Sequence, residues 1–483
     1  MIPEFLGALG LQMVPYHKNL LWCSAEITLQ EAAKRMNTMK VGSILIGTAQ
    51  NPEGILTDTD LRRAVAEGAN FGKTPVSRFM SAKLWTCTPD TYAVQALHLM
   101  LQEGISHLGI VSEAAAYKDV VGIISQRDLM RIQDLSPAGI LYSMYEAESI
   151  PKLTDCVKVS NQMISEYLQQ GIPYTQLAEI RTLLNDVLTK RVISLILESH
   201  PAPSGVSFCW IALGSQGRQE QLFPTDQDNA IIFSDVPAHE LEATRKVFLN
   251  IASQINSQLN LLGLAFCPAG MMAKNPQWCL NLSEWQQRFS SWIHKPDDVS
   301  LLHSTIFFDY RGVWGDLELE KHLTQHIKEH LLSHPLFLNY LGIDALKNPK
   351  PLGFLNRLSL EPSGSYRGMF DLKGRLLMPY IDAARLLLLN SGMADPKNTL
   401  SRFSALENAE PQNSTLFNQA AEAFEIIAGL RARLWSTLKS ADGRYLEVKD
   451  LSKNQRHTLR YAAKILHELQ ELLITRFQLS QLL

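Results

Sequence analysis

The sequence predicts a multidomain α/β protein, because three different patterns follow one another along its 483 residues. A strand–helix–strand pattern occurs twice within residues 14–133 and predicts tandem βαββα repeats. Two apolar, β-branched runs on either side of a glycine turn predict a mixed β-sheet with flanking helices within 201–320. Apolar residues at three- and four-residue spacing predict a helical connector over 134–200 and a C-terminal helical bundle over 321–483.

Charged residues make up 19% of the chain and hydrophobic residues 46%, which is typical of a folded protein rather than a disordered one. The net charge is −3 without a long basic run, which argues against a nucleic-acid partner. No apolar stretch approaches the roughly 18 residues of a membrane span, and the N-terminus lacks the pattern of a signal peptide. The six cysteines form no CxxC pair, so we expect buried thiols in a reducing cytoplasm rather than disulfides or zinc ligands.

Each copy of the N-terminal repeat ends in the motif Gly-hydrophobic-hydrophobic-Thr/Ser-x-x-Asp. The two motifs are GILTDTD, which starts at Gly54, and GIISQRD, which starts at Gly122. Parts that recur in the same order predict two copies of one structural unit. The pair resembles tandem CBS domains. That resemblance implies that the two copies pack as a unit, bind adenine nucleotides such as AMP, ADP or ATP in their clefts, and associate into a homodimer.

In both motifs a strand ends at a hydroxyl side chain, Thr57 or Ser125, and an aspartate, Asp60 or Asp128, follows at the start of a helix. The hydroxyl could contact phosphate or ribose, and the acceptor oxygens of the aspartate could hold the ribose hydroxyls. Alternatively, the hydroxyl simply caps the first turn of the helix. Because both copies keep the hydroxyl and the aspartate, we favour at least one regulatory nucleotide site. A pair that is only structural or dimerising is the alternative.

The connector begins at Ser136-Pro137, because proline is favoured at the first helical position. Its helices end at the breaker cluster HPAPSG, which introduces the central strand. The connector could carry a signal between its neighbours or act as a passive spacer, and the sequence favours neither.

The centre of the chain is a strand–turn–strand pattern. The apolar run 206–213 predicts a buried strand that ends at Gly214-Ser215, and Asp226-Gln227-Asp228 leads into a second apolar run, 230–233. Residues two apart on a strand point to the same face, with Cα atoms about 6.5–7 Å apart. Asp226 and Asp228 therefore aim two carboxylates at one spot beside the glycine turn.

Two carboxylates at one spot repel each other by a few kcal/mol at an effective dielectric constant of about 20, and one takes up a proton unless a cation joins them. Mg²⁺, or Mn²⁺ in its place, is a hard cation that accepts carboxylates and leaves positions for water and phosphate. Backbone N–H groups of a glycine turn can hold a triphosphate. This combination of positioning and charge neutralisation predicts phosphoryl-type transfer.

The ordered set of strand, Gly-Ser, Asp-x-Asp and strand resembles the polymerase-beta-like nucleotidyltransferase superfamily. The Gly217-Arg218-Gln219-Glu220 element looks like the branch that contains the protein-PII uridylyltransferase and the glutamine synthetase adenylyltransferase. The whole string GSQGRQEQLFPTDQDNAIIF is most similar to a bacterial nucleotidyltransferase-like family, the DUF294 type, which is often fused to CBS domains. The resemblance implies transfer of a nucleoside monophosphate from ATP or UTP to an acceptor, with a nucleotide site formed by Gly214, Ser215, Arg218 and Glu220.

Enzymes of this superfamily usually supply a third carboxylate from a later strand. The apolar run 301–311 is expected to be that strand, and its Asp309 is the candidate third ligand, with Asp316 as the rival. Three carboxylates could hold two metal ions that clamp the attacking and leaving oxygens. Arg311 could meet a phosphate or pair with Asp309.

The C-terminal region contains Lys373, Arg375 and Arg385, which could reach a triphosphate or form pairs within their helix. The final amphipathic helix suits packing within the chain and a dimer interface equally well. His294, His303 and His334 share no metal-ligand spacing. Without a Ser-His-Asp or Cys-His arrangement or a dinucleotide fingerprint, hydrolase and dehydrogenase functions are not expected.

The sequence therefore favours a Mg²⁺-dependent nucleotidyltransferase that modifies a protein and is regulated by adenine nucleotides at its CBS pair. A second interpretation is a non-catalytic, adenylate-sensing signal-transduction protein that uses the nucleotidyltransferase fold for binding only. A third is transfer to a small molecule, as in aminoglycoside-modifying enzymes.

Overall fold

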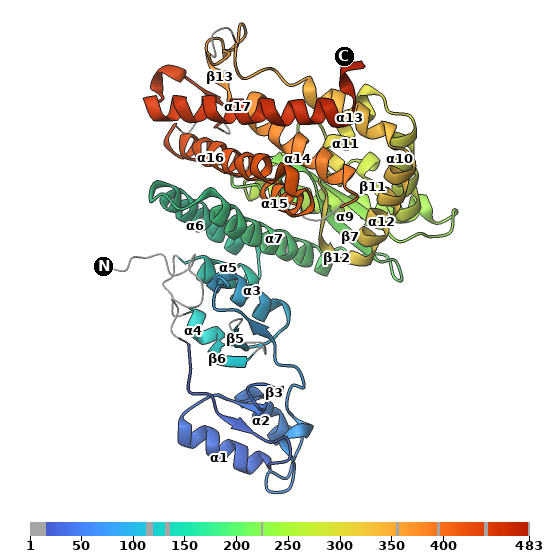
Figure 1. Ribbon diagram of the computed structural model, residues 1–483. Helices are drawn as coiled ribbons and strands as arrows, with labels where there is room; N and C mark the ends of the chain where they lie inside the picture. Colours follow the sequence, from blue (N-terminus) through green and yellow to red (C-terminus); the bar gives the residue numbers. More distant parts are fainter. Residues whose placement is uncertain are drawn as a thin grey trace. The chain divides into compact units, whose positions relative to one another are not determined.

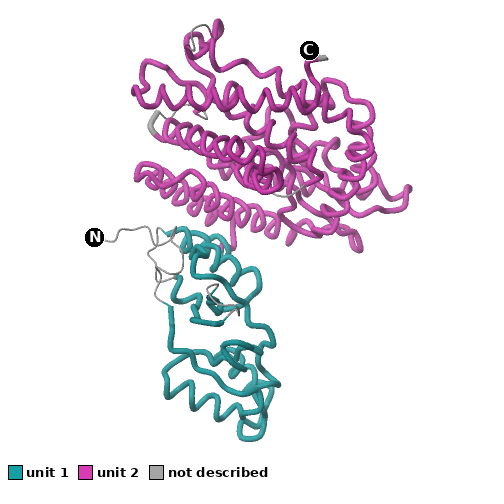
Figure 2. Tube along the Cα trace, in the orientation of Figure 1, with its two compact units in different colours: residues 1–146 teal, residues 147–483 magenta. Residues whose placement is uncertain are grey.

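The computed structural model describes residues 16–112, 119–130, 136–223, 226–353, 357–393, 397–438 and 443–481. The chain divides into two compact units, Met1–Glu146 and Ala147–Leu483 (Figures 1 and 2). Residues 14, 15 and 131–133 of the predicted repeat lie outside the described residues. None of the described helices combines the length and the apolar character needed to cross a bilayer.

The first unit contains the predicted repeat. Its first copy consists of β1 (Trp22–Cys23), α1 (Leu29–Met39), β2 (Ser43–Gly47), β3 (Pro52–Thr57) and α2 (Asp58–Ala66). Its second copy consists of β4 (Thr86–Cys87), α3 (Ala93–Gln102), β5 (His107–Ser112), β6 (Asp119–Ser125) and α4 (Gln126–Met130). The two three-stranded sheets have the same order, β1-β2-β3 and β4-β5-β6, and in each the first pair is parallel and the second antiparallel. The predicted βαββα pattern is confirmed.

The predicted connector is divided between the two units. Helix α5 (Pro137–Tyr145) starts at the N-cap Ser136, whose hydroxyl accepts a hydrogen bond from the N–H of Gly139, and packs against α3 in the first unit. Helices α6 (Ile150–Gln169) and α7 (Tyr174–Ser199) belong to the second unit, where α7 packs against α6, α9, α16 and β12.

The second unit is built on a four-stranded sheet with the order β11-β9-β7-β12. The predicted central strands are present as β7 (Phe208–Ala212) and β9 (Asn229–Phe233), which pair antiparallel. All residues of both strands are buried, because helices cover both faces of the sheet, and this explains their continuous apolar runs. The outer strands are β11 (Cys279–Asn281), parallel to β9, and β12 (Arg311–Gly315), antiparallel to β7.

Helices surround this sheet and form the C-terminal bundle (Figure 1). They are α8 (Gly214–Gly217), α9 (Leu241–Leu261), α10 (Leu282–His294), α11 (Asp298–Phe307), α12 (Leu317–Ser333), α13 (Leu336–Leu346), α14 (Met378–Asn390), α15 (Thr399–Ala409), α16 (Ser414–Leu438) and α17 (Lys453–Arg476). Two short ladders pair β8 (Asp226–Gln227) with β10 (Ala265–Phe266) and β13 (Phe370–Asp371) with β14 (Tyr445–Leu446). One hydrophobic core extends from Ile232 on the sheet to Leu466 on α17, so the sheet and the bundle are a single packed body.

The predicted strand over 301–311 is wrong: most of this run is helix α11, and only Arg311 begins a strand. Asp297 caps the helix, because its carboxylate accepts from the N–H of Ser300 while the Ser300 hydroxyl accepts from the N–H of Asp297. The buried residues Ser300, Leu301, Ser304 and Phe307 recur at helical spacing.

Candidate active site and N-terminal clefts

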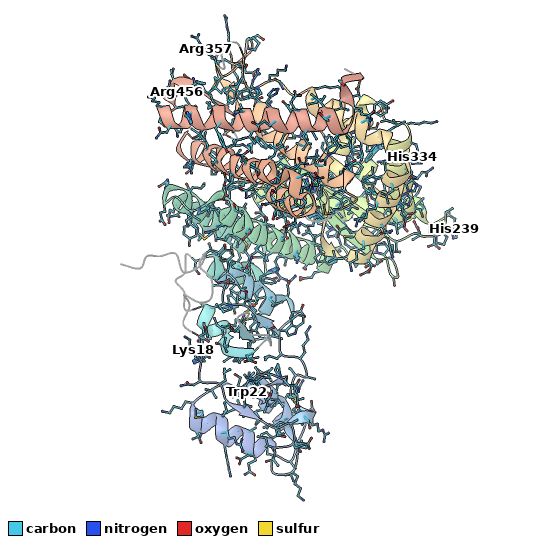
Figure 3. All side chains as sticks on the ribbon, viewed as in Figure 1. Lys18, Trp22, His239, His334, Arg357 and Arg456 are labelled. Atoms are coloured by element: carbon cyan, nitrogen blue, oxygen red, sulfur yellow. The ribbon has the colours of Figure 1, made fainter. Side chains whose placement is uncertain are left out.

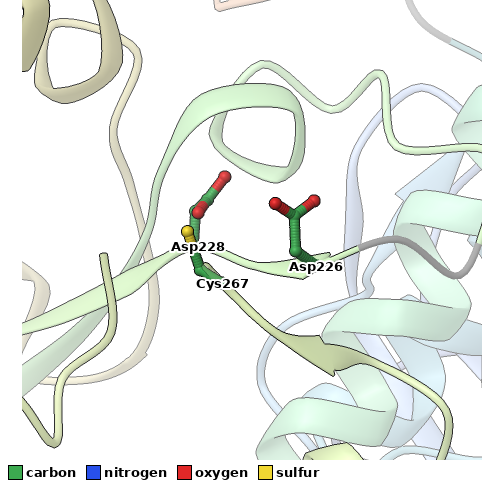
Figure 4. Close-up of side chains that lie close together, drawn as sticks. All are labelled: Asp226, Asp228 and Cys267. Carbon is green, nitrogen blue, oxygen red and sulfur yellow. The ribbon is translucent and has the colours of Figure 1, made fainter. Parts of the chain in front are cut away.

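The predicted acidic pair lies between β8 and β9, beside a cysteine from the segment after β10. One carboxylate oxygen of Asp226, one of Asp228 and Sγ of Cys267 all lie within 4.8 Å of one another. Figure 4 shows both carboxylates on the same side of the strand, with the sulfur next to Asp228. Asp226 is exposed, Asp228 is half-buried and Cys267 is buried. The acidic pair is therefore accessible to solvent on one side, and the cysteine lies beneath it.

The electrostatics of this group fit a divalent cation. The pKa of Asp228 is raised to about 6, first by burial and then by the charge of Asp226, although the Cys267 hydrogen bond and the Lys373 charge oppose the rise. Burial, and then Asp228, raises the pKa of the Cys267 thiol to about 11, so the thiol stays protonated and donates to Asp228. A hard cation such as Mg²⁺ or Mn²⁺ prefers oxygen to a protonated sulfur. The residues present therefore fit such an ion on Asp226 and Asp228, with Cys267 orienting the second carboxylate.

The glycine turn lies directly against the acidic pair. Gly214 has φ +55°, and a Cβ at this position would lie 3.3 Å from Oδ2 of Asp228. A Cβ on Gly217 would lie 1.9 Å from the carbonyl oxygen of Asp309, so no side chain fits there. The N–H of Leu213 donates to the carbonyl oxygen of Asp228 at 2.9 Å and joins the turn to the second strand.

A cavity of ≈ 780 Å³ opens above these residues. The predicted site residues of the sheet domain that line it are Gly214, Ser215, Arg218, Glu220, Asp226 and Asp228. The opposite wall comes from the C-terminal bundle, through Lys373 at the π-helical turn before α14 and through Arg431 and Trp435 on α16. Lys373 is thus the one of the three predicted basic candidates that lines the cavity.

Helix α7 holds the loop that carries the Gly-Arg-x-Glu element. The Tyr174 hydroxyl donates to the carbonyl oxygen of Glu220 at 3.0 Å, and the Thr182 hydroxyl donates to that of Gln219 at 3.1 Å. Nε of the buried Arg181 donates to the carbonyl oxygen of Leu222 at 3.1 Å. Gln219 has φ +62°, a conformation that a non-glycine residue keeps only where its surroundings fix it. Sequence reasoning missed this support, because no local motif on α7 marks it.

The assignment of Asp309 as third metal ligand is corrected by the structure. Its side chain is completely buried and both oxygens accept from guanidinium groups: Oδ2 from Arg218 at 2.8 Å, both oxygens from Arg385 at 2.5 and 3.0 Å, and Oδ1 from Arg402 at 2.8 Å. Burial alone would raise the pKa of Asp309, but the three arginines hold it well below its usual range. We call Asp309, Arg218, Arg385 and Arg402 the arginine hub. It is a structural ion cluster, and the group near the acidic pair is Cys267 instead.

Arg218 and Glu220 line the cavity but direct their charges toward each other and the hub. Nε of Arg218 donates to Oε2 of Glu220 at 2.8 Å, and both side chains are buried. Oε1 of Glu220 accepts from the N–H of Thr399 at 2.6 Å, at the first residue of α15. These contacts attach the predicted nucleotide loop to the C-terminal bundle.

The remaining candidates have other partners. Arg311 forms two hydrogen bonds to the carboxylate of Asp186, at 2.8 and 2.9 Å, so it pairs with α7 rather than with Asp309. Asp316, the rival third carboxylate, caps α12 by accepting from the N–H of Glu318. Arg375 pairs with Glu361 at 2.8 Å.

The closing motifs of the N-terminal repeat border two cavities of ≈ 540 and ≈ 380 Å³ in the first unit. Thr57 lines both cavities, Ser125 and Asp128 line the larger one, and Asp60 lines the smaller one. The Thr57 hydroxyl donates to Oδ2 of Asp60 at 2.8 Å, and the Ser125 hydroxyl donates to Oδ2 of Asp128 at 2.6 Å. The same hydroxyls accept from the N–H of Asp60 at 3.4 Å and of Asp128 at 3.3 Å, so the capping interpretation is correct for both motifs. The capping side chains also line the clefts.

The CBS domain family matches residues 14–67 and 76–134. The CBS domain-containing protein YhcV of Bacillus subtilis is 38% identical over 103 residues, which are 21% of this chain and 70% of YhcV. The chain belongs to the CBS-domain family. The mitochondrial CBS domain-containing protein CBSX3 of Arabidopsis thaliana is 32% identical over 117 residues, or 23% of this chain. The chain spans 55% of the length of CBSX3 and 62% of that of an uncharacterized 17.7 kDa protein of Acidianus ambivalens.

Beyond the CBS pair, residues 158–299 match the family "Putative nucleotidyltransferase DUF294" and residues 335–477 match "Putative nucleotidyltransferase substrate binding domain". The second unit of this CBS-domain protein is thus similar to the two domains of the DUF294 type. Among solved structures, an uncharacterized conserved protein from Pyrococcus horikoshii is 28% identical, with coverage of 26% of this chain and 92% of that one and a TM-score of 0.23. The CBS domain protein PAE2072 from Pyrobaculum aerophilum, solved complexed with AMP, is 19% identical, with coverage of 25% and 89% and a TM-score of 0.23.

Replacing Asp309 by asparagine should destabilise the protein strongly. The substitution keeps the shape but leaves three buried guanidinium groups without their shared anion, and breaking a buried ion pair costs about 3–5 kcal/mol. Urea unfolding followed by circular dichroism measures the loss. Asp298→Asn is the matched control, since the Asp298 side chain is 92% exposed. Equal stability of the two variants would contradict the structural role of the arginine hub.

The same carboxylate predicts a pH dependence of stability. The folded-state pKa of Asp309 is lowered, so its contribution is present above the unfolded pKa of about 3.9 and is lost as the pH falls below that value. The free energy of unfolding should decline between about pH 4 and pH 2 more steeply in the parent protein than in Asp309→Asn. Urea titrations across this range test the difference, and parallel curves would refute it.

Proposed function

We propose that this protein is a metal-dependent nucleotidyltransferase, which moves a nucleoside monophosphate from ATP or UTP to a protein hydroxyl group and responds to adenine nucleotides at its CBS pair. The observation that carries the proposal is the pair of carboxylates, Asp226 and Asp228, beside a close-packed glycine turn in a cavity of ≈ 780 Å³. The matches to two nucleotidyltransferase domains support the same reaction class.

In this proposal five residues that line the cavity bind the metal ion and the phosphates. Asp226 and Asp228 hold Mg²⁺ or Mn²⁺, which supplies charge neutralisation on the phosphate oxygens. The backbone at Gly214 and Ser215 approaches the β- and γ-phosphates, and Lys373 from the opposite wall adds positive charge. The acceptor oxygen bonds to the α-phosphorus, the bond to the bridging oxygen breaks, and pyrophosphate leaves with the hydroxyl proton released.

Arg218 and Glu220 act on the nucleotide indirectly, as positioning residues. Because their charges are directed toward each other and the arginine hub, they fix the loop between the glycine turn and the acidic pair. The protein acceptor is proposed from the Gly-Arg-x-Glu element, which resembles the protein uridylyl- and adenylyltransferases. A small-molecule acceptor and a non-catalytic sensor are the two outcomes that would replace it.

The regulatory part of the proposal is supported by the two clefts of the first unit. Both contain a hydroxyl–aspartate pair whose aspartate is ordered by a helix cap. Asp128 borders the larger cleft, and Asp60 borders the smaller one while its Oδ1 also accepts from Arg63 at 3.1 Å. AMP, ADP or ATP fits such a site through its ribose hydroxyls. A homodimer and a cytoplasmic location belong to the same proposal, the latter supported by six cysteines that are all free thiols.

Replacing both carboxylates, Asp226→Asn with Asp228→Asn, should abolish transfer without loss of stability. The exchange removes the two oxygen anions that would hold the cation and relieves their mutual repulsion. The assay is incubation with Mg²⁺ and α-³²P-labelled ATP or UTP, with and without cell lysate, followed by gel separation. We expect labelled protein with the parent and at least about a 100-fold decrease with the double variant, as for loss of a main electrostatic group.

The control is Asp298→Asn, which should label acceptor as the parent does. Label that appears only on small molecules would show that the acceptor is a small molecule and not a protein. An absence of label with every nucleotide, while adenylates still bind the full chain, would favour the non-catalytic sensor.

The two clefts predict separable adenylate binding. In Asp60→Asn and Asp128→Asn the side-chain oxygen can still accept the capping hydrogen bond, but the charge that would hold ribose hydroxyls is lost. Isothermal titration of the full chain with AMP should show about 10-fold weaker binding for each variant, as expected for a lost charge-assisted hydrogen bond. Asp90→Asn, at an exposed position of the same unit, is the control. Unchanged affinity in both variants would leave the aspartates as helix caps only.

A further inference from the structure

Four histidines that are scattered in the sequence come together on two packed helices of the second unit. His326, His330 and His334 recur every four residues at the C-terminal end of α12, and His294 is the last residue of α10. The ring centroids of His294 and His334 are 4.0 Å apart, those of His294 and His330 are 5.6 Å apart, and those of His326 and His330 are 4.0 Å apart. Figure 3 labels His334 at this end of the unit.

The backbone fixes the tautomer of these rings. Nδ1 of His330 lies 2.9 Å from the carbonyl oxygen of His326, and Nδ1 of His334 lies 3.1 Å from that of His330. A carbonyl oxygen only accepts, so each Nδ1 carries a proton, and in the neutral ring the lone pair is on Nε2. The His294 ring also hydrogen-bonds the backbone of Ser290, one turn earlier in α10. Histidines that bind metals are oriented in this way, through a hydrogen bond from the other ring nitrogen to a carbonyl group.

His326 supports the other three rather than joining them. Its Nε2 lies 2.8 Å from the Ser290 hydroxyl and 3.1 Å from the carbonyl oxygen of Gln286, so it joins α12 to α10. Its own carbonyl oxygen accepts a hydrogen bond from Nδ1 of His330, and the planes of the two stacked rings differ by 28°. His326 therefore sets the position of His330 and of the helix pair.

We propose that His294, His330 and His334 form a binding site for a divalent transition-metal ion of the zinc and nickel class, which links the ends of α10 and α12. Imidazole is a preferred ligand for these ions, and carboxylate and water oxygens are preferred by Mg²⁺. Three nitrogen ligands leave a further position for water or another group.

The two ring separations from His294 are near the spacing expected when imidazoles share a metal ion. Two imidazoles at Zn–N distances of about 2.0–2.1 Å have their centroids roughly 5 Å apart, and the measured separations from His294 lie on either side of this value. The three nitrogens are not all within 4.8 Å of one another, so binding requires the rings to shift from the orientations that the backbone hydrogen bonds hold. His294 is exposed, and His330 and His334 are half-buried, which leaves room for that rotation.

The test is metal titration of the full chain, without a polyhistidine tag, in the Asp226→Asn/Asp228→Asn background, so that metal binding to the acidic pair does not contribute. Ni²⁺ and Zn²⁺ are titrated by calorimetry, and Co²⁺ by its visible absorption, which reports nitrogen ligation. We expect one tight site. Loss of an outer partner costs about 10–100-fold in metal affinity, so loss of a ligand in His294→Ala, His330→Ala or His334→Ala should cost at least about 100-fold. His326→Ala keeps the backbone carbonyl that accepts from His330 and should weaken binding less than these three variants.

His322→Ala is the matched control, because His322 is exposed on the same helix and belongs to no ring contact of the cluster. Melting temperatures in EDTA should be equal for the parent background, His322→Ala and the three ligand variants, and lower for His326→Ala, which loses its side-chain contacts to α10. Zn²⁺ should raise the melting temperature only where the three ligands are present. Unchanged affinity in His294→Ala would overturn a site that links the two helices. Equal weakening in His322→Ala, or no binding in the parent background, would overturn the proposal altogether.

Discussion

The candidate active site depends on one buried interaction, between the carboxylate of Asp309 and three arginines. Its three guanidinium partners come from the loop after α8, from α14 and from α15, which lie 76 to 93 residues away in the sequence. Removing a charged side chain from water into the protein interior costs free energy. Only nearby opposite charges with good hydrogen bonds compensate for that cost. Since Arg218 stands at the glycine turn and Arg385 in the bundle, the hub fixes the two walls of the cavity relative to each other.

The charges around the hub explain why its arginines do little to offset the repulsion within the acidic pair. Arg218 pairs with Glu220, Arg385 pairs with Asp382, and all three arginines share Asp309, so the positive charges there are matched by carboxylates. Arg218 is accordingly the weakest of the influences that oppose the rise in the pKa of Asp228. Lys373 and the thiol of Cys267 therefore offset only part of the repulsion between Asp226 and Asp228.

Local patterns predicted what depends on local geometry. The continuous apolar runs predicted β7 and β9, and the two-residue period predicted that Asp226 and Asp228 share one face. Contacts between distant segments were not predictable in this way: the partners of Asp309, the support of the loop by α7, and Cys267 beside the pair have no local signal. The error over 301–311 has the same origin, because a short apolar run fits a buried strand and a buried helix alike, and the capping box at Asp297 decides between them.

The histidine cluster on α10 and α12 differs from the acidic pair in the type of metal ligand that it offers. The four-residue spacing of His330 and His334 is visible in the sequence, but the third ring comes from another helix and joins them only through packing of α10 on α12. The chain thus separates two donor sets: oxygen anions beside a glycine turn, and imidazoles whose Nδ1 atoms donate to the backbone. Because hard cations favour the first set and borderline cations the second, each site can discriminate by ligand type without competing for the same ion.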